Sequence, residues 1–291
     1  MMKVYSRYLL LLVLVLFGAK PAFAESLANL EKKGVITIAA YEDYPPYSYR
    51  DSAGKPKGID VDIAKALASE LGLSANVRLV FADESLGDDL RVYVWKGHHV
   101  TGPAADVMMH VPYDDYLIKA EDKVNFIAPY AEVQVVVAAD AEQLGASPSL
   151  TSFFEKKIGV EKVTMADGYL RGAYNGRMQN NVIPYNTMLE ATQALLKKEL
   201  SAVMGDRSQI EFGLGEYKKE YQIGLMQLPN IAKASWDLSL AVKSDYKELS
   251  KKLEMAMDKL LKNGTIKEIY SKHDINYHMP AVVVKEIASK Q

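Results

Sequence analysis

The chain has 291 residues, which is enough for two lobes of about 100–150 residues each. Its formal net charge of −2 gives no reason to expect nucleic-acid binding. It contains no cysteine, which excludes disulfides, thiolate metal ligands, a cysteine nucleophile and a lipid-bearing cysteine.

The first 24 residues are expected to be a secretory signal peptide. Lys3 and Arg7 precede the apolar run YLLLLVLVLF, and the small residues of AFA follow it, so cleavage is expected after Ala24. The run is too short and wrongly flanked for a membrane anchor, and no second long apolar run follows. We therefore expect a mature periplasmic chain, and freedom from cysteine suits an oxidising compartment.

A tyrosine-rich loop follows the first predicted strand, GVITIAAY (34–41). The segment YEDYPPYSYR (41–50) holds four tyrosines and two prolines. Proline is excluded from a helix interior and from a central strand, so the rings must be presented by a stiff turn at the strand end. They either cover an edge of the core or contact a ligand.

The first half of the chain alternates strand and helix patterns, which predicts an α/β lobe. After the tyrosine loop, DSAGKPKG is typical of a hairpin tip, IDVDIAKALASELG predicts a helix, and NVRLVFA (76–82) predicts a strand. The pattern is less regular from 83 to 105, where ESLGDDLRVYVWKG is compatible with a helix and HHVTGPAA with a loop. DVMMHVP (106–112) is again strand-like.

The second half repeats this alternation. Strands are expected at KKIGVEKV, NNVIPYN, SAVMGD and IGLMQL, and helices at ADGYLRGAYNG and NTMLEATQALLKKEL. Two amphipathic helices, DYKELSKKLEMAMDKLLKNG and TIKEIYSKH, follow, and the last residues are expected to form a loose tail.

Two β-rich segments, near 131–138 and 235–242, bracket a self-contained middle block. They predict a discontinuous outer lobe, 25–131 plus 236–291, around an inner lobe, 132–235. Two lobes joined by two crossing strands leave a cleft that can close by hinge motion on a ligand.

The segment GVITIAAYEDYPPYSYRDSAGKPKGIDVDIAKALASELG resembles the opening of the family 3 extracellular solute-binding proteins. SAVMGD, LSLAVKSD and LKNGTIKEIYSKH are similar to later segments of that family, in the right order. The resemblance implies a two-lobed type II periplasmic binding fold, α/β in class, with two crossing strands and a central ligand cleft. It implies a monomer that presents a small solute to a membrane permease of the ABC type.

The resemblance also implies site residues. Tyr41, Tyr44 and Tyr47 match positions where family members stack a ring on the ligand. Asp206 matches the acid that accepts a ligand ammonium, although a helix N-cap is an alternative role for it. Thr164, with its neighbours in GVEKVT, matches a loop that offers N–H groups and a hydroxyl to a carboxylate.

The chain departs from the amino-acid binders of that family at one point. These follow the third strand with a hydroxyl-rich segment and an arginine that holds the α-carboxylate. Here Met109, His110 and Val111 replace the hydroxyls, and no arginine lies between 92 and 170. A charge-assisted hydrogen bond contributes about 1.5–3 kcal/mol, or roughly one to two decades of affinity. We therefore expect a small polar or aromatic ligand other than an ordinary α-amino acid, with Arg91 as an alternative cation from another direction.

Three further histidine and tryptophan interpretations stay open. His110 stands where the hydroxyl segment is expected, so it is a candidate for a ligand hydrogen bond. His98, His99 and His110 fall close together in sequence, but their spacing matches no metal motif, and we expect no metal and no cofactor. Trp236 stands at the second crossing segment and either lines the cleft or belongs to the core.

Two alternatives to a transport receptor remain. DVMMHVP resembles a strand of binding-protein-like accessory factors of quinoprotein alcohol dehydrogenases, which would make such a periplasmic enzyme the partner. The periplasmic cyclohexadienyl dehydratases share the fold and carry an added acid near the strand end matched by Asp206. Here Glu211 is available but displaced, so we expect no enzyme activity.

Overall fold

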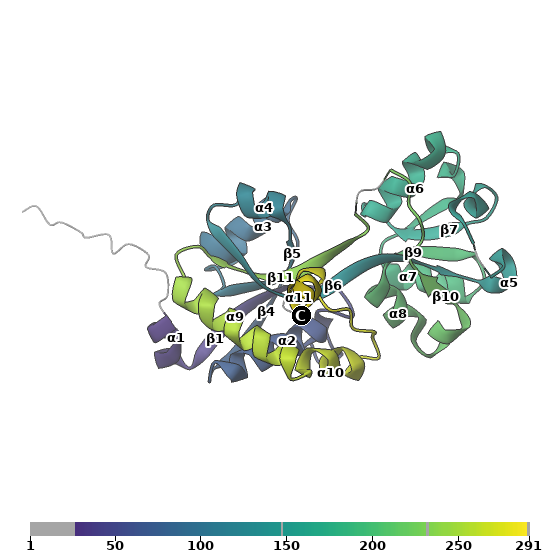
Figure 1. Ribbon diagram of the computed structural model, residues 1–291. Coiled ribbons are helices and arrows are strands. Elements are labelled where there is room, and N and C mark those ends of the chain that lie inside the picture. Colours follow the sequence, from purple (N-terminus) through teal and green to yellow (C-terminus); the bar gives the residue numbers. More distant parts are fainter. Residues whose placement is uncertain (1–26, 147, 231–232, 290–291) are drawn as a thin grey trace, which may run out of the picture.

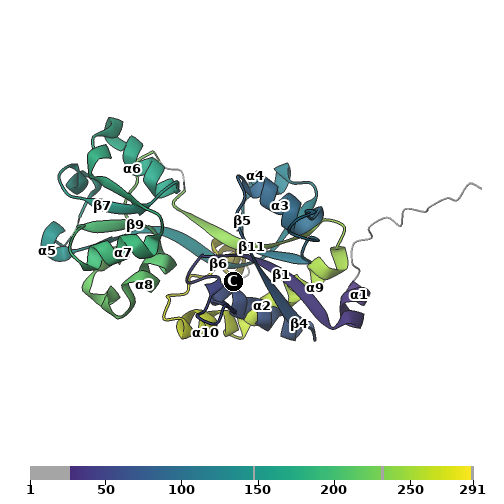
Figure 2. The same ribbon diagram turned by 180° about the vertical axis from the view of Figure 1, so that it is seen from behind.

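The computed structural model describes residues 27–146, 148–230 and 233–289. Figures 1 and 2 show two bodies joined by two long strands, and we name them by the predicted boundaries: the outer lobe ends near 131 and resumes near 236, and the inner lobe lies between. The predicted signal peptide and its cleavage site lie outside the described residues. Within these residues, no helix combines the length and apolar character that crossing a membrane requires.

The outer lobe is a sheet with helices on both faces. Its strands are β1 (Val35–Tyr41), the hairpin strands β2 (Tyr49–Arg50) and β3 (Pro56–Lys57), β4 (Ser74–Val80) and β5 (Val107–Tyr113). Its helical elements are α1 (Leu27–Lys33), α2 (Ile59–Glu70), α3 (Leu86–Leu90), a π-helical turn (Arg91–Trp95), α4 (Asp115–Ala120), α9 (Lys247–Lys262), α10 (Thr265–Lys272) and α11 (Ala281–Ser289). Alternate residues of β1 face the two sides, so Ile36 and Ile38 pack with α2 and α9 while Ala39 packs with the π-helical turn.

The inner lobe repeats the arrangement on a smaller scale. Its strands are β7 (Ile158–Glu161), β8 (Val182–Tyr185), β9 (Ala202–Asp206) and β10 (Gln222–Gly224). Its helical elements are α5 (Ala141–Leu144), α6 (Met165–Gly176), α7 (Met188–Leu196), α8 (Arg207–Leu214) and the short turns Leu150–Phe154, Gln179–Asn181 and Gly215–Glu220. β7 runs parallel to both β8 and β9, so the carboxyl ends of β7 and β9 lie at the same edge of the sheet.

Two crossing strands connect the lobes, as the sequence predicted. β6 (Val124–Ala139) pairs with β11 (Ser235–Lys243) in the outer lobe and with β9 in the inner lobe. The first crossing strand therefore starts at Val124, earlier than the predicted 131. A register shift of β11 between Leu238 and Leu240 accommodates Ala128, which has φ 52°, and the proline after it. The strand thus continues past Pro129.

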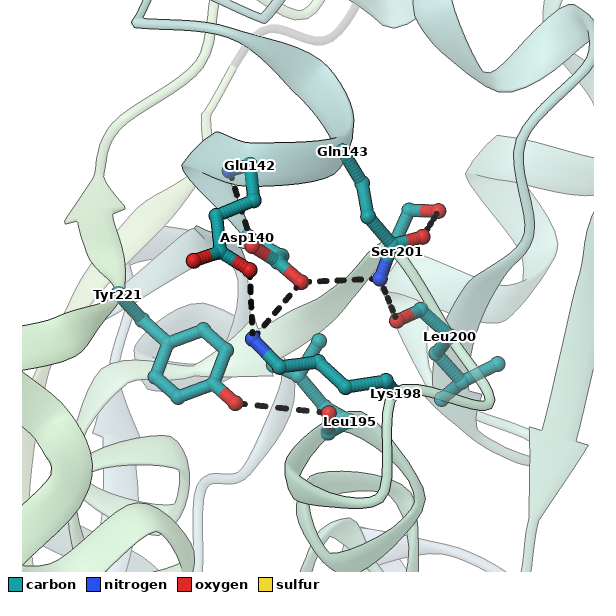
Figure 3. A network of polar contacts seen from close by, with 8 residues as sticks. All are labelled: Asp140, Glu142, Gln143, Leu195, Lys198, Leu200, Ser201 and Tyr221. Atoms are coloured by element: carbon teal, nitrogen blue, oxygen red, sulfur yellow. Dashed lines mark hydrogen bonds and ion pairs between the residues drawn. The ribbon is translucent and has the colours of Figure 1, made fainter.

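A polar network fastens the far end of β6 (Figure 3). Asp140 caps α5 and accepts hydrogen bonds from the Gln143 side chain at 2.9 Å and from the Lys198 ammonium at 3.0 Å. Gln143 in turn accepts from the Ser201 hydroxyl at 2.7 Å, and the Lys198 ammonium lies 5.4 Å from the centre of the Tyr221 ring. Burial raises the pKa of the Asp140 carboxyl, but these hydrogen bonds and the Lys198 ammonium outweigh it and hold the pKa below its usual range. The network joins β6, α7 and β9 into one unit.

Two expectations about local structure are wrong. The predicted loose tail is helix α11, because both carboxylate oxygens of Asp237 on β11 accept N–H groups at its start: Oδ1 from Ala281 at 2.7 Å and Oδ2 from Val282 at 2.9 Å. This cap comes from a distant strand and has no local signature. The predicted strand IGLMQL is also shorter, because only Gln222–Gly224 pairs with β6.

Candidate functional site

The tyrosine loop is held against the start of α2. The backbone N–H groups of Ile59 and Asp60 donate to the carbonyls of Pro46 and Tyr47 at 3.0 and 2.8 Å. Gly58 stands at this contact with φ 127°, and a Cβ there would lie 2.2 Å from the Tyr47 carbonyl oxygen. The loop is therefore rigid, and only a glycine allows this close approach of two backbone segments.

Tyr47 connects the two lobes through Asp206. Its hydroxyl donates to both carboxylate oxygens of Asp206, at 2.9 and 3.1 Å, and the ring is buried. Asp206 ends β9 and begins α8, where its Oδ1 atom accepts the N–H groups of Ser208 at 2.6 Å and Gln209 at 3.3 Å. Burial raises the pKa of the Asp206 carboxyl, and the hydrogen bond from Tyr47 opposes this rise. Both roles considered for Asp206 are compatible with this geometry, since it is a helix N-cap and also faces the tyrosine loop.

Tyr44 and His110 complete the aromatic group. The rings of Tyr44 and Tyr47 are stacked with centroids 5.4 Å apart, and the His110 ring lies edge-on to them at 5.0 and 4.3 Å. His110 has φ 63° within β5, which is uncommon outside glycine and turns its ring toward this group. Burial raises the pKa of the Tyr44 and Tyr47 phenols, and the charge of Asp206 adds to the rise. Both phenols therefore stay protonated and can donate hydrogen bonds.

A buried triad lies beneath the rings. The Nδ1 atom of His110 lies 2.8 Å from the Oδ2 atom of Asp60, and the Tyr130 hydroxyl donates to Oδ1 of the same carboxylate at 2.8 Å. The Tyr130 oxygen also accepts the His110 backbone N–H at 3.2 Å. Asp60 is fully buried, so these contacts replace its hydration. The described residues contain no group of three or more metal-ligating side chains, so the three histidines considered for a metal do not form such a cluster.

Sequence analysis missed Glu161, which ends β7 beside Asp206. Its Oε2 atom accepts the backbone N–H of Met188, at the start of α7, at 3.2 Å. Burial raises the pKa of the Glu161 carboxyl, and the charge of Asp206 raises it further. The charge of Glu161 also raises the pKa of the Tyr44 phenol, after burial and the charge of Asp206, so we count this acid with the group. The parallel order of β7 and β9 was the signal that could have placed it there, because both strands end at one edge.

Two other predicted site residues are not part of this group: Tyr41 faces away from it, and Trp236 lies at the junction between the lobes. The Tyr41 hydroxyl donates to Asp89 at 2.8 Å, so this tyrosine faces α3 rather than Tyr47. Burial and the Asp89 charge raise its pKa. Trp236 lies on β11 and packs against the main cores of both lobes, which places it at the junction between them.

Arg91 and Thr164 make their contacts elsewhere. The Arg91 guanidinium lies 3.7 Å from Asp88 on the preceding helix α3 and lines a surface hollow with Lys96, His98 and His99. Thr164 is exposed and caps α6, accepting the Asp167 N–H at 3.3 Å. The structure thus brings together Tyr44, Tyr47, His110 and Asp206 from the predicted set and adds Glu161. We call these five residues the inter-lobe site.

Glu211, the acid considered for the enzyme alternative, is directed away from the inter-lobe site. Its two carboxylate oxygens accept the backbone N–H and the side-chain amide of Asn276, each at 2.8 Å. The Arg207 guanidinium lies 3.6 Å from it. Glu211 is buried in these contacts, so it has a structural role between α8 and the C-terminal segment.

Comparison with known proteins supports the resemblance seen in the sequence. Residues 36–87 match the model of the bacterial extracellular solute-binding proteins, family 3. The chain is 24% identical over 237 residues to a putative ABC transporter arginine-binding protein of Escherichia coli, covering 81% of this chain and 89% of that one. It is also 38% identical to the cyclohexadienyl dehydratase of Pseudomonas aeruginosa, but over only 61 residues, which are 21% of this chain and 23% of that one.

The fold is also confirmed by solved structures. An ancestral cationic amino acid solute-binding protein superimposes with a TM-score of 0.68 at 18% identity, covering 84% of this chain and 98% of that one. The α/β class and the type II periplasmic binding fold expected from the sequence are therefore correct. Neither the arginine-binding relative nor the ancestral protein supports the quinoprotein alternative, which rested on seven residues.

Proposed function

We propose that this chain, a relative of the bacterial extracellular solute-binding proteins of family 3, captures a small organic solute between its lobes and delivers it to an ABC-type membrane permease. The solute enters the inter-lobe site, where rings from the outer lobe face acids from the inner lobe. Closure about β6 and β11 then covers it. The predicted boundaries of the two lobes are part of this proposal.

The observation that carries the proposal is the contact between Tyr47 and Asp206. The two residues belong to different lobes, and their hydrogen bonds of 2.9 and 3.1 Å form next to the crossing strand, where Asp206 pairs with Val135. A side chain from each lobe thus meets its counterpart at the hinge. A solute held by both sets of groups would favour the closed arrangement of the lobes.

We propose further that the chain works in the periplasm as a monomer after cleavage behind Ala24. The family to which it is related is extracellular, and the apolar run near its start supports export. Its partners are then the solute and the permease.

A catalytic role is less consistent with the site. The engagement of Glu211 with Asn276 and Arg207 leaves it directed away from Tyr47 and Asp206. We therefore propose that the chain is not a dehydratase. Incubation with prephenate and with arogenate, followed by absorbance or mass detection of the aromatic product, checks this, and turnover of either compound would refute it.

Thermal unfolding in the presence of single solutes tests the receptor function. The panel contains amino acids, amines, organic acids and small aromatic compounds. A solute present at about 100 times its Kd stabilises the folded state by about 2.7 kcal/mol, which raises the unfolding temperature measurably. Small-angle X-ray scattering with the active solute should then show a smaller radius of gyration. A panel without any stabilising solute counts against the receptor function.

A further inference from the structure

The charges of the inter-lobe site indicate which class of solute fits it, and this inference rests on the proposed function. We propose that the site takes an organic cation without a carboxylate, such as a diamine or a guanidino amine, in preference to the corresponding amino acid. Four features support this preference. They are the two acids Glu161 and Asp206, the pair formed by His110 and Asp60, the cations next to the acids in sequence, and the tyrosine rings.

Two carboxylates end neighbouring parallel strands at one edge of the inner-lobe sheet. Glu161 ends β7 and Asp206 ends β9, and these strands pair in parallel with Val160 opposite Met204. Each acid accepts an N–H group at the start of a helix, Glu161 from α7 and Asp206 from α8. A helix N-terminus carries about half a positive charge, so two such ends offset only about one of the two negative charges. The edge remains negative when both acids are ionised.

The pair formed by His110 and Asp60 does not make the site positive. His110 lies 2.8 Å from Asp60, and the two side chains together carry no net charge when the imidazole is protonated and one negative charge when it is neutral. A ligand carboxylate therefore finds no uncompensated positive charge at His110. The imidazole differs in this respect from a guanidinium, which is always charged and offers two parallel N–H groups.

The cations that flank the two acids in sequence have other partners. The Lys162 ammonium donates to the side-chain oxygen of Asn186 at 2.8 Å. The Arg207 guanidinium donates to the Gln134 side chain at 3.1 Å and lies 3.6 Å from Glu211. Both positive groups are thus engaged by other side chains rather than by Glu161 or Asp206.

The rings add a second attraction for a cation. The charges that act on Tyr44 are the carboxylates of Asp206, Glu161 and Asp60, so its ring lies in a negative field. A cation within about 6 Å of an aromatic face gains about 0.5–2 kcal/mol. Tyr44 is only partly buried, whereas Tyr47 and His110 are buried, so the Tyr44 ring is the aromatic surface open to a solute.

Three matched pairs of compounds test the inference, because the members of each pair differ only by one carboxylate. The pairs are agmatine with arginine, putrescine with ornithine, and cadaverine with lysine, each titrated calorimetrically into the intact protein. An amino acid whose carboxylate finds no partner loses about one to two decades of affinity. We expect the amine of at least one pair to bind tenfold or more tightly than its amino acid.

Two substitutions identify the site. Glu161→Gln removes one of the two acids at this sheet edge and should weaken amine binding about tenfold or more, whereas Glu216→Gln changes an exposed acid of the same lobe and should leave binding unchanged. Circular dichroism of both variants checks that they fold. Equal loss in the two variants would overturn the assignment to Glu161.

The outcomes separate this inference from the function on which it rests. Tighter binding of the amino acid in every pair overturns the inference and leaves the receptor function intact. Absence of binding by all six compounds also overturns the inference. A blank result from the wider solute panel, by contrast, would count against the receptor function itself.

Discussion

The Tyr47 hydroxyl makes the residue-scale contact on which the inter-lobe site depends. It donates to both oxygens of Asp206, and the two residues lie 159 positions apart in sequence. Asp206 is nearly fully buried, so losing this donor would leave a charged group less well satisfied. The contact therefore bears on stability as well as on ligand recognition.

Tyr47→Phe should lower the free energy of unfolding by about 1–3 kcal/mol, because a hydrogen bond to a charged acceptor is lost while the ring remains. Urea denaturation followed by circular dichroism measures the change. Tyr49→Phe is the matched control, since Tyr49 contacts Phe212 and Lys57 through its ring. An equal effect of the two substitutions would show that the Tyr47 hydroxyl contributes nothing specific.

Binding of a cation should depend on pH through Asp206 and Glu161. Burial raises the pKa of both carboxyls above the ordinary 3.8 and 4.5. A cation favours the ionised forms and lowers these pKa values, so binding releases protons and affinity falls as the pH drops through the raised values. Tyr44 and Tyr47 stay neutral because their pKa values are raised, so they do not change the sign.

Calorimetric titration of agmatine from about pH 7.5 to about pH 5 checks this dependence. We expect weaker binding at the lower pH, and the variant Glu161→Gln should show a shallower dependence. Affinity that increases toward low pH would be inconsistent with ionised acids holding the ligand.

At the scale of elements, the join between the tyrosine loop and α2 sets the position of the rings. The loop carbonyls of Pro46 and Tyr47 accept N–H groups from the first residues of the helix. The helix start thus positions the loop, and the loop in turn satisfies N–H groups that a helix end leaves free. A change at this join should therefore move the rings and loosen the helix together.

Gly58→Ala should destabilise the protein by more than about 3 kcal/mol, because the added Cβ would lie 2.2 Å from the Tyr47 carbonyl oxygen. Gly54→Ala is a matched comparison: Gly54 also has positive φ, 76°, but nothing lies within 4 Å of its Cβ position. This second change should cost only the backbone strain of about 1–2 kcal/mol. Similar unfolding midpoints for the two variants in urea would contradict the close approach.

Individual helices and strands could be predicted where hydrophobic spacing and turn residues agree. The apolar residues of α2 recur at helical spacing, and the strand before the tyrosine loop is one apolar run, so both were placed correctly. The start of β6 and the helix α11 were missed, because each depends on a distant partner. β6 continues past Pro129 by pairing with β11, and α11 is capped by Asp237.

At the scale of the whole molecule, further contacts join the lobes behind the crossing strands. The Lys218 ammonium, in the inner lobe, lies 2.9 Å from the Asp274 carboxylate after α10. Glu211 on α8 accepts the two Asn276 donors. Together with β6 and β11, which connect the two lobes in Figure 1, these contacts form a broad hinge region.

Four of the residues predicted for the site lie close together, and the family resemblance had placed three of them on one loop and one strand end. Tyr44, Tyr47, His110 and Asp206 meet in space, whereas Arg91 and Thr164 lie in other contacts. The local sequence does not show which side of a lobe a side chain faces, so Arg91 could not be excluded from the ligand site in advance. Glu161 was missed for the same reason, since its place depends on the order of β7 and β9.

Native mass spectrometry of the protein mixed with a metabolite extract tests most directly whether the inter-lobe site holds the solute. The wild-type protein should carry one small organic adduct per chain. A variant with Asp206→Asn and Glu161→Gln together should lose that adduct while remaining folded, and Glu216→Gln should keep it. An adduct that persists in the double variant, or no adduct on the wild-type protein, would contradict capture between the lobes.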